Sequence, residues 1–324
     1  MRIFITGVDG TLGRVLHNEL RHRGHEVYGC DLHHDADPCI ERADVAEYRQ
    51  LERAFRKARP EVVYHLAAEF GRQNGEAYYE QLWRTNCLGT RNVIECCLNQ
   101  NAKLVFASSS EAYGDVDGYG DSSEDYREEW LEQYAPDFHN EYALTKWTNE
   151  RQIRIAKRHR GLQAVILRFF NAYGPGEYYS PYRSVVCLFI YRLMHGLPIT
   201  VNRGGRRDFM WVGDWARTAA TVAERFDQAT VHPAINIGGT ESVSIVELKD
   251  KVLELLGGSA SEIRYLQDEK ANVTAKKPDL TIAEQILDHS PDTTLDEGLP
   301  LTVDWMKEEY SFAQPPVVYA RSRR

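Results

Sequence analysis

Ile3-Phe4-Ile5-Thr6-Gly7-Val8-Asp9-Gly10-Thr11-Leu12-Gly13 joins a short apolar run to three evenly spaced glycines. A helix is expected to follow up to about Arg23, and Glu26–Asp31 has the composition of a second strand. Glycines permit a tight turn and close backbone approach, and the helix N-terminus offers free N–H groups to a pyrophosphate. The stretch therefore predicts a dinucleotide-binding unit. Its residues expected at the cofactor are Gly7, Asp9, Gly10, Thr11, Leu12 and Gly13.

Asp31 closes the second predicted strand, where a dinucleotide presents its adenosine ribose. A carboxylate at this place accepts a hydrogen bond from the ribose 2′-OH and repels a 2′-phosphate, so we predict NAD rather than NADP. His33, His34 and Arg42 are nearby groups that could instead favour a phosphate.

Strands and helices continue to alternate after this unit. Tyr48–Ala58 and Tyr78–Asn99 are expected to be helices, and Glu61–Ala68 and Lys103–Ala107 supply strands. Repeated βα units imply an α/β fold with a doubly wound parallel sheet of the Rossmann type. The further residues expected at the cofactor are Asp44, Val45, Leu66, Ala67, Ala68 and Asn86.

The strand that begins at Lys103 leads into Ser108-Ser109-Ser110-Glu111. Ligands of open α/β sheets bind just outside the carboxyl ends of the strands, so this polar cluster is well placed for chemistry. The alternative is a serine-rich loop that caps the next helix.

Tyr142 and Lys146 are four residues apart in a helix expected over Asn140–His159, which places them on one face. An ammonium near a phenol favours the phenolate, so Lys146 should lower the pKa of Tyr142 and allow it to act as a general base. The acidic, turn-rich stretch Asp115–Asn140 before this helix is expected to be a solvated loop.

Composition excludes several classes of function for this 324-residue chain. A net charge of −9 argues against a general nucleic-acid-binding protein. Six cysteines without metal-ligand spacing indicate reduced thiols in a cytoplasmic protein with no bound metal, and His33-His34 suits a solvated loop. No apolar run approaches the roughly 18 residues that span a membrane.

The motifs together resemble the extended short-chain dehydrogenase/reductases, in particular the NAD-dependent nucleotide-sugar epimerases and dehydratases. The matching stretches, in chain order, are Thr6–Gly13, His65–Ala68, Ser108–Gly114, Tyr142–Lys146, Arg168–Gly176, Arg206–Phe209, Asn236–Gly239 and Thr294–Leu299. This resemblance covers nearly the whole chain. It implies an NAD-binding Rossmann domain over residues 1–168 with a return at about 207–240. It also implies a smaller α/β region, mainly 169–324, that binds the sugar nucleotide.

The resemblance further implies that Asn171 and Arg207 contact the diphosphate of a nucleotide sugar. Tyr179 and Arg183 fall where the family places its substrate loop, so we expect them to contact the substrate, with ordinary packing as the alternative. The family often dimerises through the helices expected at Tyr78–Asn99 and Asn140–His159, which implies a homodimer.

In the implied mechanism, Tyr142 takes the proton of the sugar C4 hydroxyl while hydride passes to NAD. Lys146 holds the cofactor ribose, and Ser109 hydrogen-bonds the reacting oxygen. The resulting 4-keto sugar can then be epimerised, dehydrated or, if it carries a C6 carboxylate, decarboxylated.

Glu111 and Ser110 bear on this choice. Family dehydratases typically have aspartate then glutamate at these places, whereas serine then glutamate resembles GDP-mannose dehydratases and UDP-glucuronate decarboxylases. We predict an NDP-hexose 4,6-dehydratase with Glu111 as the acid/base. The alternatives are an NDP-uronate decarboxylase, an NDP-sugar 4-epimerase and, more remotely, a non-catalytic NAD-binding regulatory protein.

Overall fold

Seven strands form the main sheet, in the order β11-β6-β5-β4-β1-β2-β3. A computed structural model describes residues 1–33, 36–114, 125–134, 136–258, 262–267 and 277–310. Every neighbouring pair in this sheet is parallel, so the predicted doubly wound Rossmann fold is confirmed. The strands are β1 (Arg2–Thr6), β2 (Glu26–Asp31), β3 (Ile40–Arg42), β4 (Val62–His65), β5 (Lys103–Ser109), β6 (Ala164–Phe169) and β11 (Ile235–Ile237).

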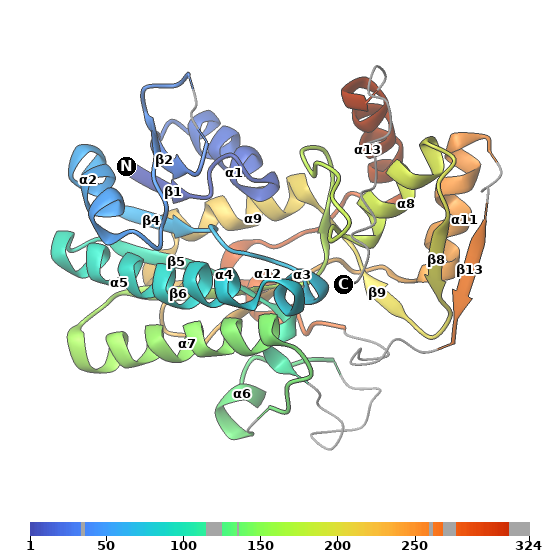
Figure 1. Cartoon of the computed structure of the whole chain (residues 1–324). Helices are drawn as coiled ribbons and strands as arrows, with labels where there is room; N and C mark the ends of the chain where they lie inside the picture. Colours follow the sequence, from blue (N-terminus) through green and yellow to red (C-terminus); the bar gives the residue numbers. More distant parts are fainter. Residues whose placement is uncertain (34–35, 115–124, 135, 259–261, 268–276, 311–324) are drawn as a thin grey trace.

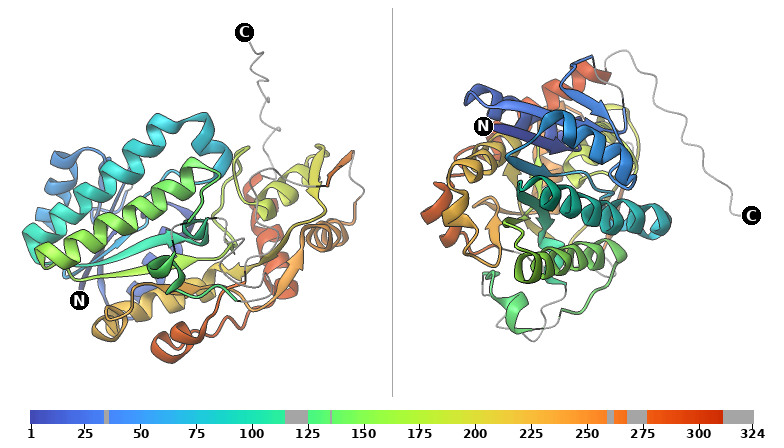
Figure 2. Two further views of the ribbon diagram at one scale, coloured as in Figure 1. Left: turned by 90° about the horizontal axis from the view of Figure 1, so that it is seen from below. Right: turned by 90° about the vertical axis from the view of Figure 1, so that its left-hand side faces the viewer.

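Helices cover both faces of the sheet because successive side chains of its strands point to opposite sides. Ile3 and Ile5 of β1 belong to one apolar core, and Phe4 between them belongs to the other. The first face carries α1 (Thr11–His22), α9 (Val212–Glu224) and α12 (Thr281–Leu287), and the second carries α2 (Tyr48–Ala58), α5 (Gly89–Gln100) and α7 (Glu141–Arg160). The helices α5 and α7 run side by side (Figures 1 and 2).

The helix expected over Tyr78–Asn99 is present as an unbroken helical stretch, with a π turn in it that the sequence did not predict. The chain there forms α4 (Tyr79–Trp83), a π-helical turn η1 (Arg84–Leu88) and α5, after the short α3 (Arg72–Ala77). A π turn widens the helix locally and often marks a functional position. Here it contains the buried Asn86, whose Oδ1 accepts from the Glu69 N–H (2.9 Å) and whose Nδ2 donates to the Glu69 carbonyl (3.0 Å).

The solvated loop expected over Asp115–Asn140 is wrong for residues 125–134, while 115–124 and residue 135 lie outside the described residues. Tyr126 and Trp130 are buried in a cluster of aromatic and apolar side chains. The Tyr126 N–H donates to the carbonyl of Lys277 (2.7 Å), and Asn236 Nδ2 donates to the Tyr126 carbonyl (2.7 Å). The aromatic side chains between the acidic ones therefore anchor this segment, and the short α6 (Trp130–Gln133) follows.

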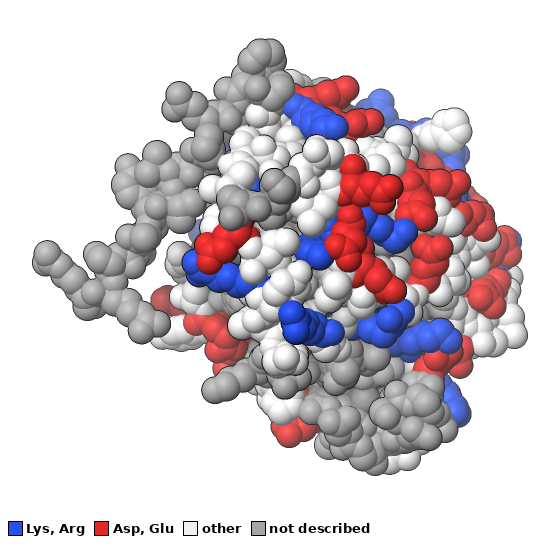
Figure 3. All heavy atoms as spheres, turned by 90° about the vertical axis from the view of Figure 1, so that its right-hand side faces the viewer, with Lys and Arg blue, Asp and Glu red and all other residues white. Residues whose placement is uncertain are grey.

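A smaller lobe is built from short sheets and three helices around its own apolar core. Its strands pair as β7 (Ala172–Tyr173) with β10 (Met210–Trp211), β8 (Ile199–Asn202) with β13 (Ile263–Leu266), and β9 (Arg206–Asp208) with β12 (Ser242–Ser244). The helices are α8 (Val185–Met194), α11 (Ile245–Leu256) and α13 (Leu295–Tyr310). Acidic and basic side chains are intermingled on its outer face (Figure 3), and pairs such as Lys251–Asp296 and Arg264–Glu262 occur there.

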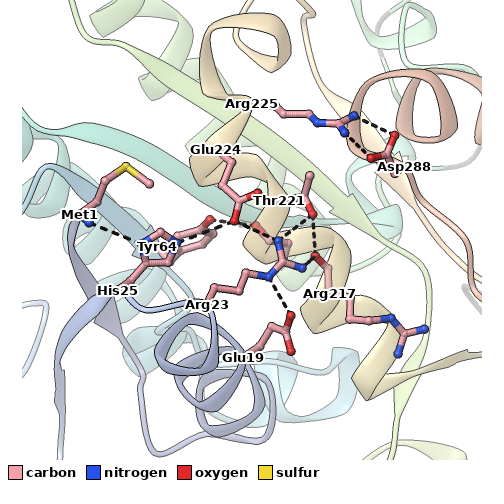
Figure 4. A network of polar contacts seen from close by, with 11 residues as sticks. Met1, Glu19, Arg23, His25, Tyr64, Arg217, Thr221, Glu224, Arg225 and Asp288 are labelled. Carbon is pink, nitrogen blue, oxygen red and sulfur yellow. Dashed lines mark hydrogen bonds and ion pairs between the residues drawn. The ribbon is translucent and has the colours of Figure 1, made fainter.

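The chain returns from the smaller lobe to the Rossmann sheet at α9, at the short α10 (Phe226–Ala229) and β11, and again at α12. Polar contacts hold α9 to α1 (Figure 4). The Arg23 guanidinium donates to Glu19 (2.8 Å), Thr221 (3.1 Å) and the carbonyl of Arg217 (2.9 Å). This cross-link lies away from the carboxyl ends of the strands, so its role is to hold two helices of the same layer together.

Candidate active site

The glycine loop after β1 is folded tightly against its neighbours. Gly7 has a φ of +73°, and its N–H donates to the carbonyl of Cys30 in β2 (2.8 Å). A Cβ on Gly13 would lie 2.1 Å from the Gly7 carbonyl oxygen, so only glycine lets α1 pack this close. The first turn of α1 has no side-chain cap and no acidic residue. Its free N–H groups therefore suit the anionic pyrophosphate of a dinucleotide.

Asp31 lies at the end of β2, and each of its carboxylate oxygens accepts one backbone N–H. Oδ2 accepts from Asp9 (3.0 Å) and Oδ1 from Leu32 (2.7 Å). An ionised carboxylate has about four acceptor sites, so capacity remains for ribose hydroxyls. This donor and acceptor set fits the adenosine half of NAD.

Replacing Asp31 with serine is expected to reduce the ratio of the affinities for NAD and NADP by about tenfold or more. The variant loses the repulsion between the carboxylate and the 2′-phosphate of NADP, and a loss of about 1.4 kcal/mol already gives a factor of ten. The measurement is the dissociation constant of each dinucleotide. Asp37→Ser, which changes an acidic residue of the following turn that caps Cys39, is the control and should leave the ratio unchanged. Equal affinity of the unaltered protein for both dinucleotides would refute the assignment.

Buried polar side chains hold the loop after β4 in place. His65 hydrogen-bonds Thr6 of β1 (2.7 Å) and Thr90 of α5 (3.0 Å), and burial lowers its pKa to about 3, so the ring is neutral. Asn86 uses its amide on the Glu69 backbone and on Thr145 Oγ1 (3.1 Å). Asn86 therefore supports the chain just after the loop that contains Leu66, Ala67 and Ala68, and its contact with the cofactor stays a prediction.

Asp44 and Val45, which are also predicted at the cofactor, make contacts with neighbouring protein groups. Asp44 Oδ1 caps the turn by accepting the N–H of Ala46 (2.8 Å). The buried Val45 side chain packs where a Cβ on Gly89 would meet it at 2.7 Å, and its carbonyl accepts from Asn92 (2.9 Å). Contact of these two residues with the cofactor stays a prediction.

The predicted catalytic residues meet at the carboxyl end of β5, which extends two residues beyond the expected end at Ala107. Tyr142 on α7 hydrogen-bonds the side chain of Ser109, and the charge of Glu111 acts on the same phenol. Glu111 lies on the turn η2 (Ser110–Tyr113), with its N–H donating to Ser109 Oγ (3.2 Å). The buried Lys146 donates through Nζ to the carbonyl of Ala107 (2.7 Å).

The sequence predicts that Lys146 lowers the pKa of Tyr142. In the protein without its cofactor, this prediction is wrong. Burial raises the pKa of Tyr142 and Glu111 raises it further, while the hydrogen bond with Ser109 lowers it. Lys146 Nζ is 5.8 Å from the centre of the Tyr142 ring, and burial lowers its own pKa to about 8 against the opposing effects of Cys87 and Glu150. Burial of the phenol therefore dominates its pKa, and Ser109, not Lys146, is the group that lowers it.

Ser108 and Ser110 differ from Ser109 in their surroundings. Ser108 is buried and donates to Glu150 Oε1 (2.6 Å), so its hydroxyl serves the structure behind the site. Ser110 is also buried and begins η2. Ser109 is the member of the cluster that hydrogen-bonds Tyr142, and its role in the reaction stays a prediction.

A buried polar network behind these residues was missed by the sequence reasoning. Arg168 at the end of β6 forms a two-pronged pair with Glu150 of α7 (2.8 and 3.0 Å) and donates to the Tyr113 hydroxyl (3.0 Å). The Tyr113 hydroxyl donates to Asn236 Oδ1 (2.8 Å), and Glu128 Oε1 accepts from the Asn236 N–H (2.9 Å). The available signal was that Glu150 follows Lys146 by four residues, on the same helix face.

Glu128 should make the protein less stable as the pH rises. Burial raises its pKa to about 7, with Asp279 adding to the rise and Asn236 and Arg168 opposing it. Between about pH 4.5 and 7 the folded protein therefore binds more protons than the unfolded chain, and the free energy of unfolding falls, by about 3 kcal/mol in all.

Glu128→Gln keeps an oxygen that can accept from Asn236 and removes the titrating group. Urea unfolding at pH 5, 6, 7 and 8 should show a smaller decline for this variant than for the unaltered protein. Glu129→Gln, the neighbouring glutamate, is the control and should retain the original decline. Identical pH profiles for the unaltered protein and Glu128→Gln would contradict the assignment.

The residues predicted to bind substrate lie in the smaller lobe and on the segment that joins it to β6. Asn171 is exposed, with a φ of +38°, and donates to the Asp208 carbonyl (3.3 Å), while Arg207 lies half-buried on β9. The ring of Tyr179 stacks on Tyr191 with 3.7 Å between ring centres. This placement favours packing for Tyr179, and its contact with substrate stays a prediction. The guanidinium of Arg183 lies 4.5 Å from the centre of the Phe70 ring.

The chain combines a glycine loop, an acidic strand end and a Ser–Tyr–Lys cluster, and known proteins match it over most of its length. A model of the NAD dependent epimerase/dehydratase family matches residues 3–238. The chain belongs to this family. Its NAD dependence is thereby established, as the sequence predicts.

Relatives cover almost the whole chain. A UDP-N-acetyl-alpha-D-glucosaminuronate decarboxylase of Bacillus cytotoxicus is 30% identical over 323 residues, spanning 95% of this chain and 98% of its own. An epimerase of Methanothermobacter thermautotrophicus has a TM-score of 0.85 at 26% identity, covering 95% and 93% of the two chains. The UDP-glucose 4-epimerase of Thermus thermophilus, solved in complex with NAD, has a TM-score of 0.79 at 27% identity, covering 95% and 99%.

The family member described here thus falls among the NAD-dependent nucleotide-sugar epimerases, dehydratases and decarboxylases. Within the described ranges, no three His, Cys, Asp or Glu side chains lie together in a way that could hold a metal ion. None of the described helices is both long and apolar enough to cross a bilayer.

Proposed function

We propose that the protein is an NDP-uronate decarboxylase, which oxidises C4 of a nucleotide-linked uronic acid and releases its C6 carboxylate as carbon dioxide. The observation that carries this choice is Glu111 beside Tyr142, with a serine, Ser110, directly before it in the chain. It departs from the sequence-based preference for a 4,6-dehydratase, which remains the second candidate with 4-epimerisation.

The chemistry of the leaving group favours decarboxylation over dehydration at this pair. Loss of water from C6 expels a hydroxyl group and benefits from a nearby acid, but the residue before Glu111 is a serine, which is a very weak acid. A 4-keto uronate is a β-keto acid, and carbon dioxide leaves such a compound without protonation of the leaving group. One acid, at Glu111, then suffices to protonate C5.

Arg183 is the candidate for recognising the C6 carboxylate. Its Nε is buried and makes no hydrogen bond to a described residue, and its guanidinium stacks on Phe70. Phe70 leads into α3, where a Cβ on Gly75 would lie 3.6 Å from the Cβ of Tyr142. A guanidinium matches a carboxylate with two parallel hydrogen bonds, which supports a uronate over a neutral hexose.

The roles of the other residues follow from the site geometry. When bound, NAD supplies the hydride acceptor for C4. Tyr142 takes the C4 hydroxyl proton, and Ser109, already hydrogen-bonded to Tyr142, orients the same oxygen. Lys146 keeps donors free beyond its bond to Ala107 and can hold ribose hydroxyls. Asn171 and Arg207 are proposed to bind the diphosphate.

The deciding experiment incubates the purified holoenzyme with UDP-glucuronate, UDP-N-acetylglucosaminuronate, UDP-glucose and dTDP-glucose, followed by product mass. Loss of carbon dioxide from a uronate is expected, and Tyr142→Phe should abolish it. Loss of water from a hexose would establish the dehydratase instead. An unchanged mass with an altered C4 configuration would establish the epimerase. If no sugar nucleotide reacts and none reduces the bound NAD, a regulatory role is favoured.

We also propose that the protein is a homodimer that pairs through α5 and α7. Leu88, just before α5, and Ile155 on α7 are exposed apolar side chains, at 47% and 57%. Light scattering of the unaltered protein and of Ile155→Glu tests this pairing.

A further inference from the structure

Residues 174–184, which we call the substrate segment, are firmly held by the smaller lobe. The buried carboxylate of Glu177 accepts the N–H (2.9 Å) and the hydroxyl (2.6 Å) of Ser184, the cap of α8. The Tyr179 N–H donates to the hydroxyl of Tyr310 at the end of α13 (2.8 Å). The segment therefore has a defined shape and is tied to its lobe.

The substrate segment contacts the Rossmann domain near both of its ends, beside loops that are expected at the cofactor. The hydroxyl of Thr11, in the glycine loop after β1, donates to the carbonyl of Gly176 (3.0 Å). At the other end of the segment, Arg183 stacks on Phe70, two residues after the Leu66–Ala68 loop of β4. A Cβ on Gly71 would lie 3.1 Å from the Tyr182 carbonyl, so the backbones also approach closely there.

Both anchor points lie beside loops that are expected to hold NAD. β1 and β4 are neighbours in the sheet, so their loops emerge side by side at its carboxyl edge. The glycine loop and the N-terminus of α1 suit the pyrophosphate, and the loop after β4 offers flat backbone beside it. A segment fastened beside both loops therefore spans from one to the other at this edge of the sheet.

We propose that Thr11 is a positioning residue whose hydroxyl fastens the substrate segment to the glycine loop, so that the segment encloses bound NAD during the reaction. The family reactions return the hydride to the sugar, so the cofactor need not leave between turnovers. The inference rests on NAD binding and not on the decarboxylase proposal. Its failure would leave the identity of the reaction open to the substrate panel.

The test compares Thr11→Val, which keeps the shape and removes the donor, with Thr11→Ser, which keeps the donor. The NAD-loaded proteins are diluted, and the loss of bound NAD is followed with time by filtration and chromatography. Removing one hydrogen bond should speed the release of NAD about three- to tenfold in Thr11→Val, with Thr11→Ser close to the unaltered protein. Thr200→Val, at an exposed position of β8, is the matched control and should release NAD at the original rate.

Hydrogen exchange of the same holoenzymes separates a fastened segment from a direct contact of Thr11 with the cofactor. Faster exchange across residues 176–184 in Thr11→Val, restored in Thr11→Ser, is the expected result. Unchanged release of NAD overturns the proposal, and so does faster release with unchanged exchange in the segment. Phe70→Leu, which weakens the other anchor, should produce the same two changes independently.

Discussion

Glu150→Ala is expected to lower the free energy of unfolding by about 3–5 kcal/mol, because it leaves the guanidinium of Arg168 buried without a counter-charge. Both side chains are 0% exposed and meet through two hydrogen bonds. Burial alone would lower the pKa of Arg168, but Glu150 and Tyr113 outweigh it and hold that pKa above its ordinary value. The arginine therefore cannot escape the cost by losing its proton.

Urea unfolding of the variant measures this loss. Glu95→Ala is the matched control, since Glu95 is also a helical glutamate paired with arginines, Arg91 and Arg160, but on the surface. Glu95→Ala should lower the free energy of unfolding by less than about 1 kcal/mol. The double variant Glu150→Leu with Arg168→Met removes both charges and should regain part of the loss. Equal effects of Glu150→Ala and Glu95→Ala would show that the buried pair does not have the strength assigned to it.

The same pair explains why the catalytic cluster holds its shape. Glu150 accepts the hydroxyl of Ser108, the residue before Ser109, and lies on the helix that carries Tyr142 and Lys146. Arg168 belongs to β6, beside β5, and also donates to the carbonyl of Glu128 (3.0 Å). The site is therefore built on a rigid polar support that joins β5, β6, β11 and α7.

The Rossmann sheet could be predicted from sequence because its signals are local. The glycine loop, Asp31 and the alternation of apolar runs each report on a few neighbouring residues, and the structure has β2 at Glu26–Asp31 and α2 at Tyr48–Ala58 as expected. The cluster of Tyr142, Ser109 and Glu111 could also be anticipated, since the carboxyl ends of parallel strands share one edge.

What could not be predicted depends on partners far apart in the chain. A buried arginine or glutamate looks like a surface residue until its counter-charge is located, and Arg168, Glu128 and Asn236 come from three separate stretches. The anchoring of residues 125–134 has the same cause. The π turn at Asn86 could not be foreseen either, because its amide is satisfied by Glu69 and Thr145, outside any local pattern.

Glu111→Gln is expected to lower turnover by a factor of about 10²–10⁴ while leaving the first oxidation intact. Tyr142, Ser109 and Lys146 perform that oxidation, and none of them depends on a proton from Glu111 in the proposed scheme. Protonation of C5 after carbon dioxide leaves does depend on it, and an amide cannot supply that proton. Reduced cofactor should therefore build up on the variant when a uronate is added, visible by its absorbance, while release of the decarboxylated sugar nearly stops.

Glu132→Gln, on α6, is the matched control and should keep full turnover, because Glu132 pairs with Arg154 away from Tyr142. Ser110→Ala distinguishes dehydration from decarboxylation. Removing the hydroxyl donor at this position should slow the loss of water and leave the rate of carbon dioxide loss unchanged. A Glu111→Gln variant with undiminished turnover would remove decarboxylation and dehydration together. Epimerisation would then remain, because returning hydride to the other face of the 4-keto sugar needs no second acid.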